Sequence, residues 1–344
     1  MNINIDYTLE ILKKYMDIPS PGGYTHLAIE EFKNDVEKYG LATKFTKKGA
    51  LIIEVPGENN EEAIMITAHM DTLGGMVKEI MPDGKLRFHK IGGGTWNAFE
   101  GENCWLINRK HKKIRGSIMP KKASTHIYGA EVAGELRTEH NILVRIDEKV
   151  SCKKDVEDLG IRVGDFVCLD TRTEITESGF IKSRYIDDKS AVAMILEICR
   201  YFKENNIKPK YKTYLCISNY EEIGHGLSVI PEDTKEVVAI DIGTVGQWQE
   251  STEYAVSIAA KDARGPYDIM LIEKLIDVAE SNEVDYKIDV YNGYTSDASQ
   301  AIGRGADIQF ACIGPGVDAT HHYERTHKDA VENTLKLLIG YMMK

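Results

Sequence analysis

The stretch AIMITAHMD, residues 63–71, joins a short apolar run directly to two polar residues, His69 and Asp71. An apolar run of six residues bounded by polar and turn residues is typical of a strand that is buried on both faces. In open α/β sheets, ligands bind beyond the carboxyl ends of the strands. The stretch therefore predicts a strand whose carboxyl end lies at a ligand site.

Three other segments repeat this pattern outward from residues 63–71. The apolar run at residues 211–218 leads to Glu221 and Glu222, and residues 236–240 lead to Asp241. A further run at residues 308–313 precedes His321 and His322. Between these strands lie helical stripes, such as Val192, Ile195, Cys199 and Phe202. Strands that alternate with helices predict an α/β fold with a mixed central sheet flanked by helices.

The sequence pattern changes at residues 72–177, where short β-like runs and loops are frequent and helical stripes are few. The glycines at 92–94 do not match a phosphate-binding loop and are predicted to form a turn. We therefore expect a small β domain, at residues 72–177, inserted into a catalytic α/β domain made of residues 1–71 and 178–344.

The acidic and imidazole side chains at the strand ends suit a pair of divalent cations, because zinc, cobalt and manganese accept carboxylate oxygen and imidazole nitrogen. Two such ions need a bridging carboxylate and terminal ligands for each. Asp187, just before a predicted helix, can bridge, and Glu221 is left over as a general base. Asp71 can orient the imidazole of His69. The predicted metal ligands are His69, Asp187, Glu222, Asp241 and His321.

Each of these short motifs also has a structural explanation. Glu221-Glu222 can form a solvated surface, and Asp187-Asp188 can cap the helix that starts near Ser190. His321 and His322 are adjacent, so the sequence leaves open which of the two binds metal. The metal interpretation rests on the motifs taken together, because all of them fall at the ends of predicted strands or helices and follow one another in a particular order.

This order resembles that of the M42 metallopeptidases, an aminopeptidase family related to the M20 and M28 enzymes. The resemblance covers essentially the whole chain. It rests on the segments AHMD (68–71), RYIDDK (184–189), YEEIG (220–224), AID (239–241), TSDA (295–298) and HHYE (321–324). Two departures are Thr72-Leu73, where the family usually has Glu-Ile, and Lys189, where Arg is common.

The resemblance implies an α/β catalytic domain with an inserted β-barrel or PDZ-like domain. It implies the same five metal ligands, with Glu221 as general base and Asp71 as the support of His69. It further implies two metal ions per subunit, peptide substrates, and assembly into homo-oligomers, in many members dodecamers.

Composition and charge argue against nucleic acid and membranes as partners of the protein. A net charge of -11 provides no basic field for nucleic acid. No apolar stretch reaches the roughly 18 residues of a membrane-spanning helix. The first residues contain no secretory signal, and the six scattered cysteines read as buried thiols. These features predict a cytoplasmic protein.

Three other functions compete with an aminopeptidase. An M20-like deacylase or carboxypeptidase uses the same ligands, but tends to need a cationic group for the substrate carboxylate. A glycosidase needs two carboxylates that flank a sugar, which the adjacent Glu221 and Glu222 cannot provide. A metal-free binding scaffold would lack a ligand or the base, whereas every position here has a suitable residue.

Overall fold

A computed structural model describes residues 1–344 and divides them into two compact units. Unit 1 comprises Met1–Asp71 and Arg172–Lys344, and unit 2 comprises Thr72–Thr171. The second boundary of the units thus precedes residues 172–177, which the sequence-based division assigned to the inserted domain. In the structure, residues 172–177 contain the short strand β10 (Glu174–Ile175). This strand pairs with β11, which belongs to unit 1.

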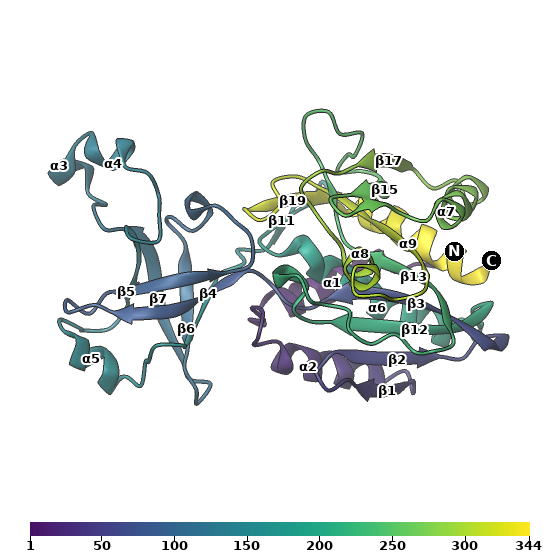
Figure 1. The fold of residues 1–344 in the computed structure, drawn as a ribbon, viewed down its shortest axis with the longest axis horizontal. Helices are drawn as coiled ribbons and strands as arrows, with labels where there is room; N and C mark the ends of the chain where they lie inside the picture. Colours follow the sequence, from purple (N-terminus) through teal and green to yellow (C-terminus); the bar gives the residue numbers. More distant parts are fainter. The chain divides into compact units, whose positions relative to one another are not determined.

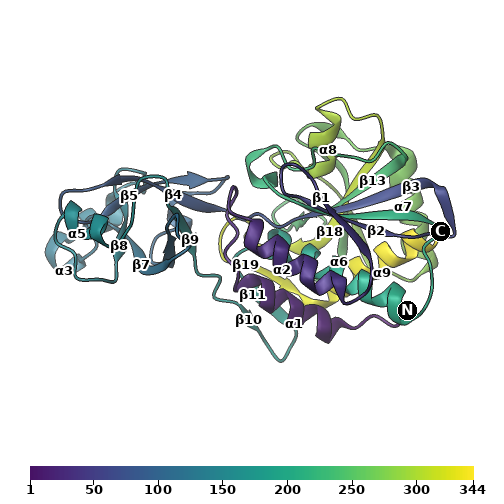
Figure 2. The same cartoon turned by 90° about the horizontal axis from the view of Figure 1, so that it is seen from below.

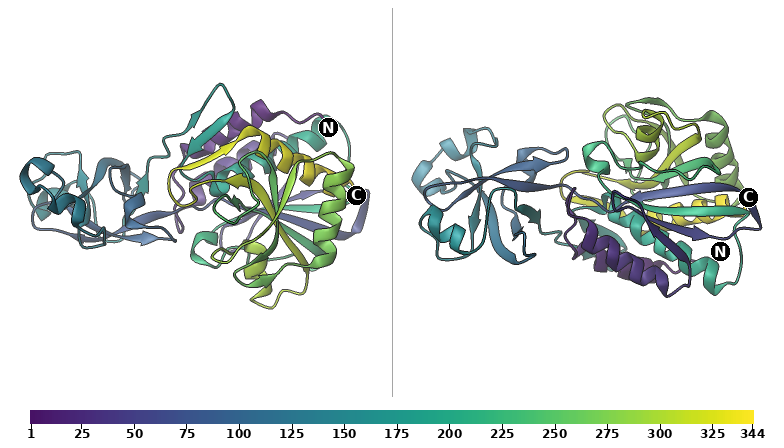
Figure 3. Two further views of the ribbon diagram at one scale, coloured as in Figure 1. Left: turned by 90° about the horizontal axis from the view of Figure 1, so that it is seen from above. Right: turned by 60° about the horizontal axis from the view of Figure 1, so that its bottom comes forward.

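The centre of unit 1 is a ten-stranded mixed sheet with the strand order β1-β2-β12-β3-β13-β18-β15-β16 (Figure 1). Strands β14 and β17 pair with β18 and β15 beside this path. The four middle strands run parallel, and β2 and β15 flank them in the antiparallel direction. The strands twist relative to one another (Figure 3). Their bounds are β1 Ala42–Phe45, β2 Leu51–Val55, β3 Asn59–His69, β12 Tyr211–Ser218, β13 Thr234–Ile240, β14 Gly243–Thr244, β15 Val256–Asp262, β16 Gly265–Pro266, β17 Tyr286–Val290 and β18 Gln309–Val317.

Helices cover both faces of this sheet. Figure 2 shows α1, α2, α6 and α9 on one side and the short α8 on the other. Because both faces of β3 are covered, residues 63–69 are all buried, and this strand reads as a continuous apolar run. The helix bounds are α1 Ile5–Met16, α2 His26–Glu37, α6 Ile186–Glu204, α7 Ile269–Ser281, α8 Asp297–Ile302 and α9 Lys328–Met343.

The register of the parallel strands brings their carboxyl ends to one edge of the sheet. Ser218 at the end of β12 lies opposite His69 at the end of β3. Ile240 in β13 lies opposite Ile313 in β18, and Asp241 follows Ile240 directly. The polar residues that follow these strands therefore gather at a single edge, as the sequence pattern predicts.

A second, three-stranded sheet brings two further segments to this edge. It consists of β10, β11 (Phe180–Ser183) and β19 (Glu324–His327), paired antiparallel. Ser183 pairs with Glu324, so the start of α6 lies beside the loop that contains His321.

Unit 2 is a closed barrel with the strand order β4-β5-β8-β7-β6-β9. In β7 every second residue is buried, as expected of a strand with one face on the barrel's core. Gly75 in β4 pairs with Val167 in β9, so the chain enters and leaves this unit on neighbouring strands. The strand bounds are β4 Gly74–Ile80, β5 Leu86–Ile91, β6 Asn103–Ile107, β7 Lys113–Pro120, β8 Ile142–Ile146 and β9 Phe166–Leu169.

Unit 2 also contains the short helices α3 (Thr125–Tyr128), α4 (Glu131–Gly134) and α5 (Lys153–Asp158) and the 3-10 turn η1 (Trp96–Ala98). The predicted fold class, a mixed sheet flanked by helices with an inserted small β-barrel, is confirmed. None of the chain's helices combines the length and the apolar character that crossing a bilayer requires.

Candidate metal centre

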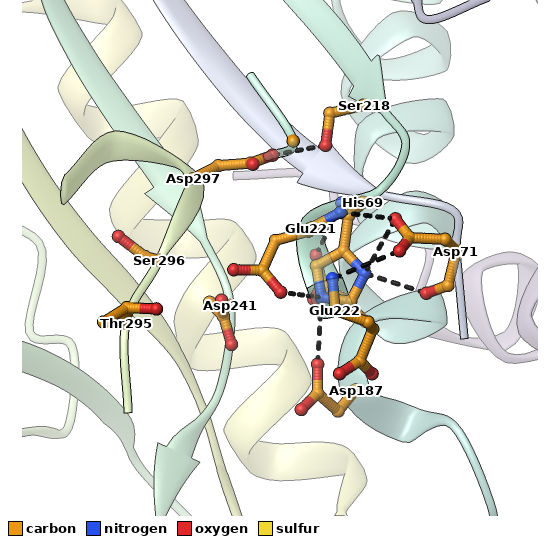
Figure 4. Close-up of polar contacts among 12 residues, drawn as sticks. His69, Asp71, Asp187, Ser218, Glu221, Glu222, Asp241, Thr295, Ser296 and Asp297 are labelled. Atoms are coloured by element: carbon orange, nitrogen blue, oxygen red, sulfur yellow. Dashed lines mark hydrogen bonds and ion pairs between the residues drawn. The ribbon is translucent and has the colours of Figure 1, made fainter. Parts of the chain in front are cut away.

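The imidazole of His69 lies at the end of β3 between a carboxylate and a carbonyl (Figure 4). Its Nε2 is 3.1 Å from Asp187 Oδ1, and its Nδ1 is 2.9 Å from the main-chain oxygen of Asp71. Burial opposes a charge on this ring, but the hydrogen bond to Asp187 outweighs burial and raises the pKa of His69. The carbonyl on Nδ1 leaves Nε2 as the nitrogen that faces the acidic cluster.

Asp187 lies at the start of α6, between the two histidines. The peptide bond from Asp187 to Asp188 is cis, and helical geometry begins after Asp188. The other oxygen of Asp187, Oδ2, is 3.6 Å from His321 Nε2. Burial opposes ionisation of Asp187, but hydrogen bonds from His321 and His69 dominate and lower its pKa. This carboxylate is therefore anionic and shared by two imidazoles.

Two clusters of possible ligands share Asp187. One contains His69, Asp187 and Asp241, and the other contains Asp187, Glu222 and His321; within each, the ligand atoms lie within 4.8 Å of one another. Glu222 Oε2 is 3.3 Å from His321 Nε2. The structure thus brings all five predicted ligands to one place. It places His321, and not the exposed His322, beside Glu222.

The carboxylate of Asp71 has a different partner from the expected one. Its oxygens accept hydrogen bonds from the main-chain N–H groups of Glu221 and Glu222, at 3.0 and 3.1 Å. Its Oδ1 is 3.8 Å from His69 Nδ1, and the main-chain oxygen of Asp71 makes the hydrogen bond to that ring instead. The chain turns back at Asp71, so one residue holds both the imidazole of His69 and the backbone that carries the two glutamates.

Glu221 begins the short 3-10 turn η2 (Glu221–Ile223) that follows β12. Its Oε2 is 3.8 Å from His69 Nε2, and Asp241 lies on the same side of the cluster (Figure 4). Burial, reinforced by the charge of Asp241, raises the pKa of Glu221 well above its usual value. Burial likewise raises the pKa of Asp241. Glu221 is thus a buried carboxyl group close to both ligand clusters.

Three residues with left-handed backbone conformations set the direction of the chain where it enters the segments that carry the site residues. Tyr185 precedes Ile186 and Asp187, Tyr220 precedes Glu221, and His321 itself has a φ of 63°. Such conformations cost of order 1–3 kcal/mol at a residue other than glycine, and they occur often at functional sites. The Tyr220 ring stacks on His225, with centroids 5.2 Å apart, and thereby helps to hold its turn.

Sequence reasoning gave no role to two carboxyl groups that hold the site. Glu324 accepts hydrogen bonds from the main-chain N–H groups of Asp187 and His321, both at 3.1 Å. Asp188 accepts one from the N–H of His69 at 3.0 Å. The position of Glu324, three residues after His321, is a weak signal of this role. The contact between Asp188 and His69 depends on the packing of α6 against β3 and has no local signal.

The donor set fits a pair of divalent cations. Seven acidic side chains gather around two imidazoles, and burial raises the pKa of all of them except Asp187: Asp71, Asp188, Glu221, Glu222, Asp241 and Glu324. A cluster of carboxylates at this depth is costly unless cations compensate it. Carboxylate and imidazole together are the ligands that zinc, cobalt and manganese accept. The residues present therefore match what such a pair of ions requires.

Comparison with known proteins assigns the chain to a family. The sequence model of the M42 glutamyl aminopeptidases matches residues 49–337. The chain belongs to the M42 family. It is 45% identical over 336 residues to the Bacillus subtilis (strain 168) protein YhfE, which carries the name of an aminopeptidase, and the match covers 97% of each chain. This M42 chain is therefore an enzyme of the peptidase class.

Two solved peptidase structures share the fold. The aminopeptidase APDkam598 from the archaeon Desulfurococcus kamchatkensis superimposes with a TM-score of 0.88 at 23% identity, over 99% of this chain and 95% of the other. The Pyrococcus horikoshii TET1 peptidase gives a TM-score of 0.84 at 21% identity, over 98% and 99%. The latter is described as assembling into a tetrahedron or a large octahedral shell.

Proposed function

We propose that this M42 chain is a two-metal aminopeptidase that removes amino-terminal residues from peptides. The observation that carries the proposal is the pair of ligand clusters that share Asp187. His69 and Asp241 would hold one ion, Glu222 and His321 the other, and Asp187 both. Bound there, the ions would lower the pKa of a water molecule and polarise the scissile carbonyl.

Glu221 is the general base in this proposal. It is a buried carboxyl group that is not needed as a ligand, and its Oε2 points toward His69. It accepts a proton from the attacking water at Oε2 and then delivers that proton to the leaving amine. Asp71 fixes the position of Glu221 through the main-chain N–H that it binds.

The family supports an aminopeptidase over an M20-like deacylase or carboxypeptidase. The family model that matches this chain is that of the M42 glutamyl aminopeptidases, and the Bacillus subtilis relative carries the name of an aminopeptidase.

The test is hydrolysis of aminoacyl-p-nitroanilides and short peptides by chelated enzyme after zinc, cobalt or manganese is added back. We expect metal-dependent cleavage of unblocked substrates and two ions per chain by elemental analysis. Cleavage of only acylated substrates or of carboxyl-terminal residues would replace the proposal with a deacylase or carboxypeptidase. No bound metal and no activity would indicate a binding scaffold.

Glu221→Gln keeps the size of the side chain but removes the base. We expect the variant to keep its metal content and its KM within a few-fold, and to lose about 10²- to 10⁴-fold in kcat. Steady-state kinetics with elemental analysis measures both. A kcat near that of the wild type would remove Glu221 from this role.

We also infer that the chain forms homo-oligomers. The structurally similar Pyrococcus horikoshii TET1 peptidase is described as assembling into a shell, and Ile127 and Leu136 in unit 2 of this chain, 75% and 82% exposed, are apolar side chains available for contacts between copies. Light scattering coupled to size-exclusion chromatography should give a mass several times the 38.6 kDa of one chain. Ile127→Ser with Leu136→Ser should lower that mass, whereas a monomeric wild type would refute the inference.

A further inference from the structure

We propose that Gln300 is a positioning residue for Glu221: its side-chain amide holds one oxygen of the carboxylate and leaves the other oxygen for proton transfer. The inference rests on the proposed role of Glu221. Gln300 lies on α8, 79 residues along the chain from Glu221, and none of the motifs at the strand ends contains it.

The contact between the two side chains is short and buried. Gln300 Nε2 donates to Glu221 Oε1 at 2.7 Å, and Gln300 is only 2% exposed. The same nitrogen lies 3.4 Å from the main-chain oxygen of Glu221. The free oxygen, Oε2, is the one that lies 3.8 Å from His69 Nε2. The amide therefore sets which oxygen of Glu221 faces the metal ligands.

The orientation of the amide is fixed by its surroundings. Gln300 Oε1 accepts from the N–H of Gly226 and from Arg304 Nη2, both at 3.4 Å. Arg304 is itself held by the main-chain oxygens of Leu227 and Gly224, at 3.1 and 2.5 Å. Because both neighbours of Oε1 are donors, the nitrogen must be the atom that faces Glu221.

An amide nitrogen can only donate, so Glu221 Oε1 is held as an acceptor and Oε2 is left for proton transfer. The contact also removes the rotational freedom of the carboxylate about its last torsion, which is broad in an unrestrained glutamate. Productive geometry in an active site is sensitive to displacements of about 1 Å, which can cost 10²-fold in rate. Gln300 would therefore act on turnover without contacting the substrate.

A packing role for Gln300 would be different. Gly226 lies in the segment after η2, and Arg304 lies just after α8, so Gln300 can also act only as a structural link between that segment and the helix. A structural link would affect folding and metal binding as much as turnover. A positioning residue would affect turnover alone, and only while Glu221 is present.

The experiment is a double-mutant cycle on the full-length, metal-loaded enzyme with Gln300→Met, which keeps length and volume but has no amide. We expect kcat to fall about 10- to 100-fold while KM, metal stoichiometry and metal affinity by calorimetry stay within two-fold of the wild type. In the Glu221→Gln background, Gln300→Met should have no further effect on the residual kcat. Gln309→Met is the matched control, because Gln309 is exposed and binds only Asp268.

An unchanged kcat in Gln300→Met would overturn the inference. So would an equal fall of kcat in the Glu221→Gln background, or a parallel loss of metal affinity, because both indicate a structural link. Crystal structures of the wild type and Gln300→Met give a readout independent of activity: one Glu221 conformation in the first and several in the second are expected, and identical conformations would overturn it. If Glu221→Gln alone keeps full activity, the general-base role of Glu221 fails, and the inference for Gln300 fails with it.

Discussion

Glu222 and His321 hold protons that a bound cation must displace. Burial raises the pKa of Glu222 to about 8. Burial opposes the charge of His321, but hydrogen bonding to Asp187 outweighs it and raises the pKa to about 10. Both groups are mostly protonated at pH 7, and both must lose their protons to bind a metal.

We therefore predict that metal binding at pH 7 releases protons and strengthens as the pH rises from 6 to 8. The measurement is calorimetric titration of chelated protein with zinc in two buffers of different ionisation enthalpy. His321→Ala should release fewer protons and bind fewer ions, whereas His322→Ala should match the wild type. The opposite result would transfer the ligand role to His322, and pH-independent binding would contradict the prediction.

Asp35 illustrates a carboxylate whose role is stability alone. It is 4% exposed and accepts hydrogen bonds from Lys14, Tyr15 and Lys38 at 2.5 to 2.7 Å. Burial opposes its charge, but these donors dominate and lower its pKa. A pKa lower in the folded than in the unfolded state stabilises the fold above the unfolded value of about 3.9. That stabilisation is lost as the pH falls through the folded value.

Asp35→Asn should thus lower the free energy of unfolding by about 2–3 kcal/mol at pH 7, because it leaves the ammonium groups of Lys14 and Lys38 without an anionic acceptor. Urea denaturation measures this, and the difference from the wild type should shrink below about pH 4. Glu37→Gln, in the same helix, is the control. Its ion pair with Lys33 is exposed, so the change should stay within about 0.5 kcal/mol. A loss as large as that of Asp35→Asn would refute the argument.

At the scale of elements, α8 holds the segment that follows the two glutamates. Asp297 accepts the N–H of Leu227 at 2.7 Å and also binds the hydroxyl of Ser218 at the end of β12 (Figure 4). Gly226 lies so close to this helix that a Cβ there would be 1.8 Å from Asp297 Oδ1. The segment and the helix therefore fit together only with glycine at this position.

We predict that Gly226→Ala lowers the free energy of unfolding by about 1–3 kcal/mol, because the added methyl forces α8 and the segment apart. It should also lower kcat, since Glu221 and Glu222 directly precede this segment. Thermal unfolding and steady-state kinetics measure the two effects. Gly246→Ala, where a Cβ meets nothing within 4 Å, should change stability by less than about 0.5 kcal/mol. Equal behaviour of the two variants would contradict the prediction.

The sequence predicted the four parallel strands of the central sheet and the polar residues that follow them, because apolar runs and their polar ends are local features; it predicted no strand at β1 or β15. The run at residues 211–218, for example, is strand β12. The sequence did not predict that α8 contributes to the site. This helix has six residues and no apolar stripe, and the contact from Gln300 to Glu221 depends on how α8 packs on the sheet. The hydrogen bond from the main-chain N–H of Glu221 to the Asp71 carboxylate was not predicted for a similar reason, since it depends on the turn that brings η2 back to β3.

At the scale of the whole molecule, unit 2 has the features of an autonomous domain. Its barrel is closed, so no strand edge depends on unit 1 for pairing. Its core contains Phe88, Leu106, Ile118 and Val144, all at most 1% exposed. The chain ends of the unit lie on the paired strands β4 and β9.

A fragment of residues 72–171 should therefore fold without unit 1. We expect a β-rich circular dichroism spectrum, a dispersed NMR spectrum and one cooperative thermal transition. Leu106→Asp should abolish that transition, because it buries an unpaired charge in the barrel, and the exposed Arg109→Asp should keep it. A fragment with no cooperative transition would show that the barrel depends on the rest of the chain.

The position of β18 between β13 and β15 has a consequence for biosynthesis. Chains emerge from the ribosome amino terminus first and tend to fold domain by domain. Here β18, an inner strand of the main sheet, and His321 after it are made later than every other strand of that sheet. A growing polypeptide that already contains the whole barrel of unit 2 therefore still lacks one of the proposed metal ligands, and we expect hydrolytic activity only after His321 has left the ribosome.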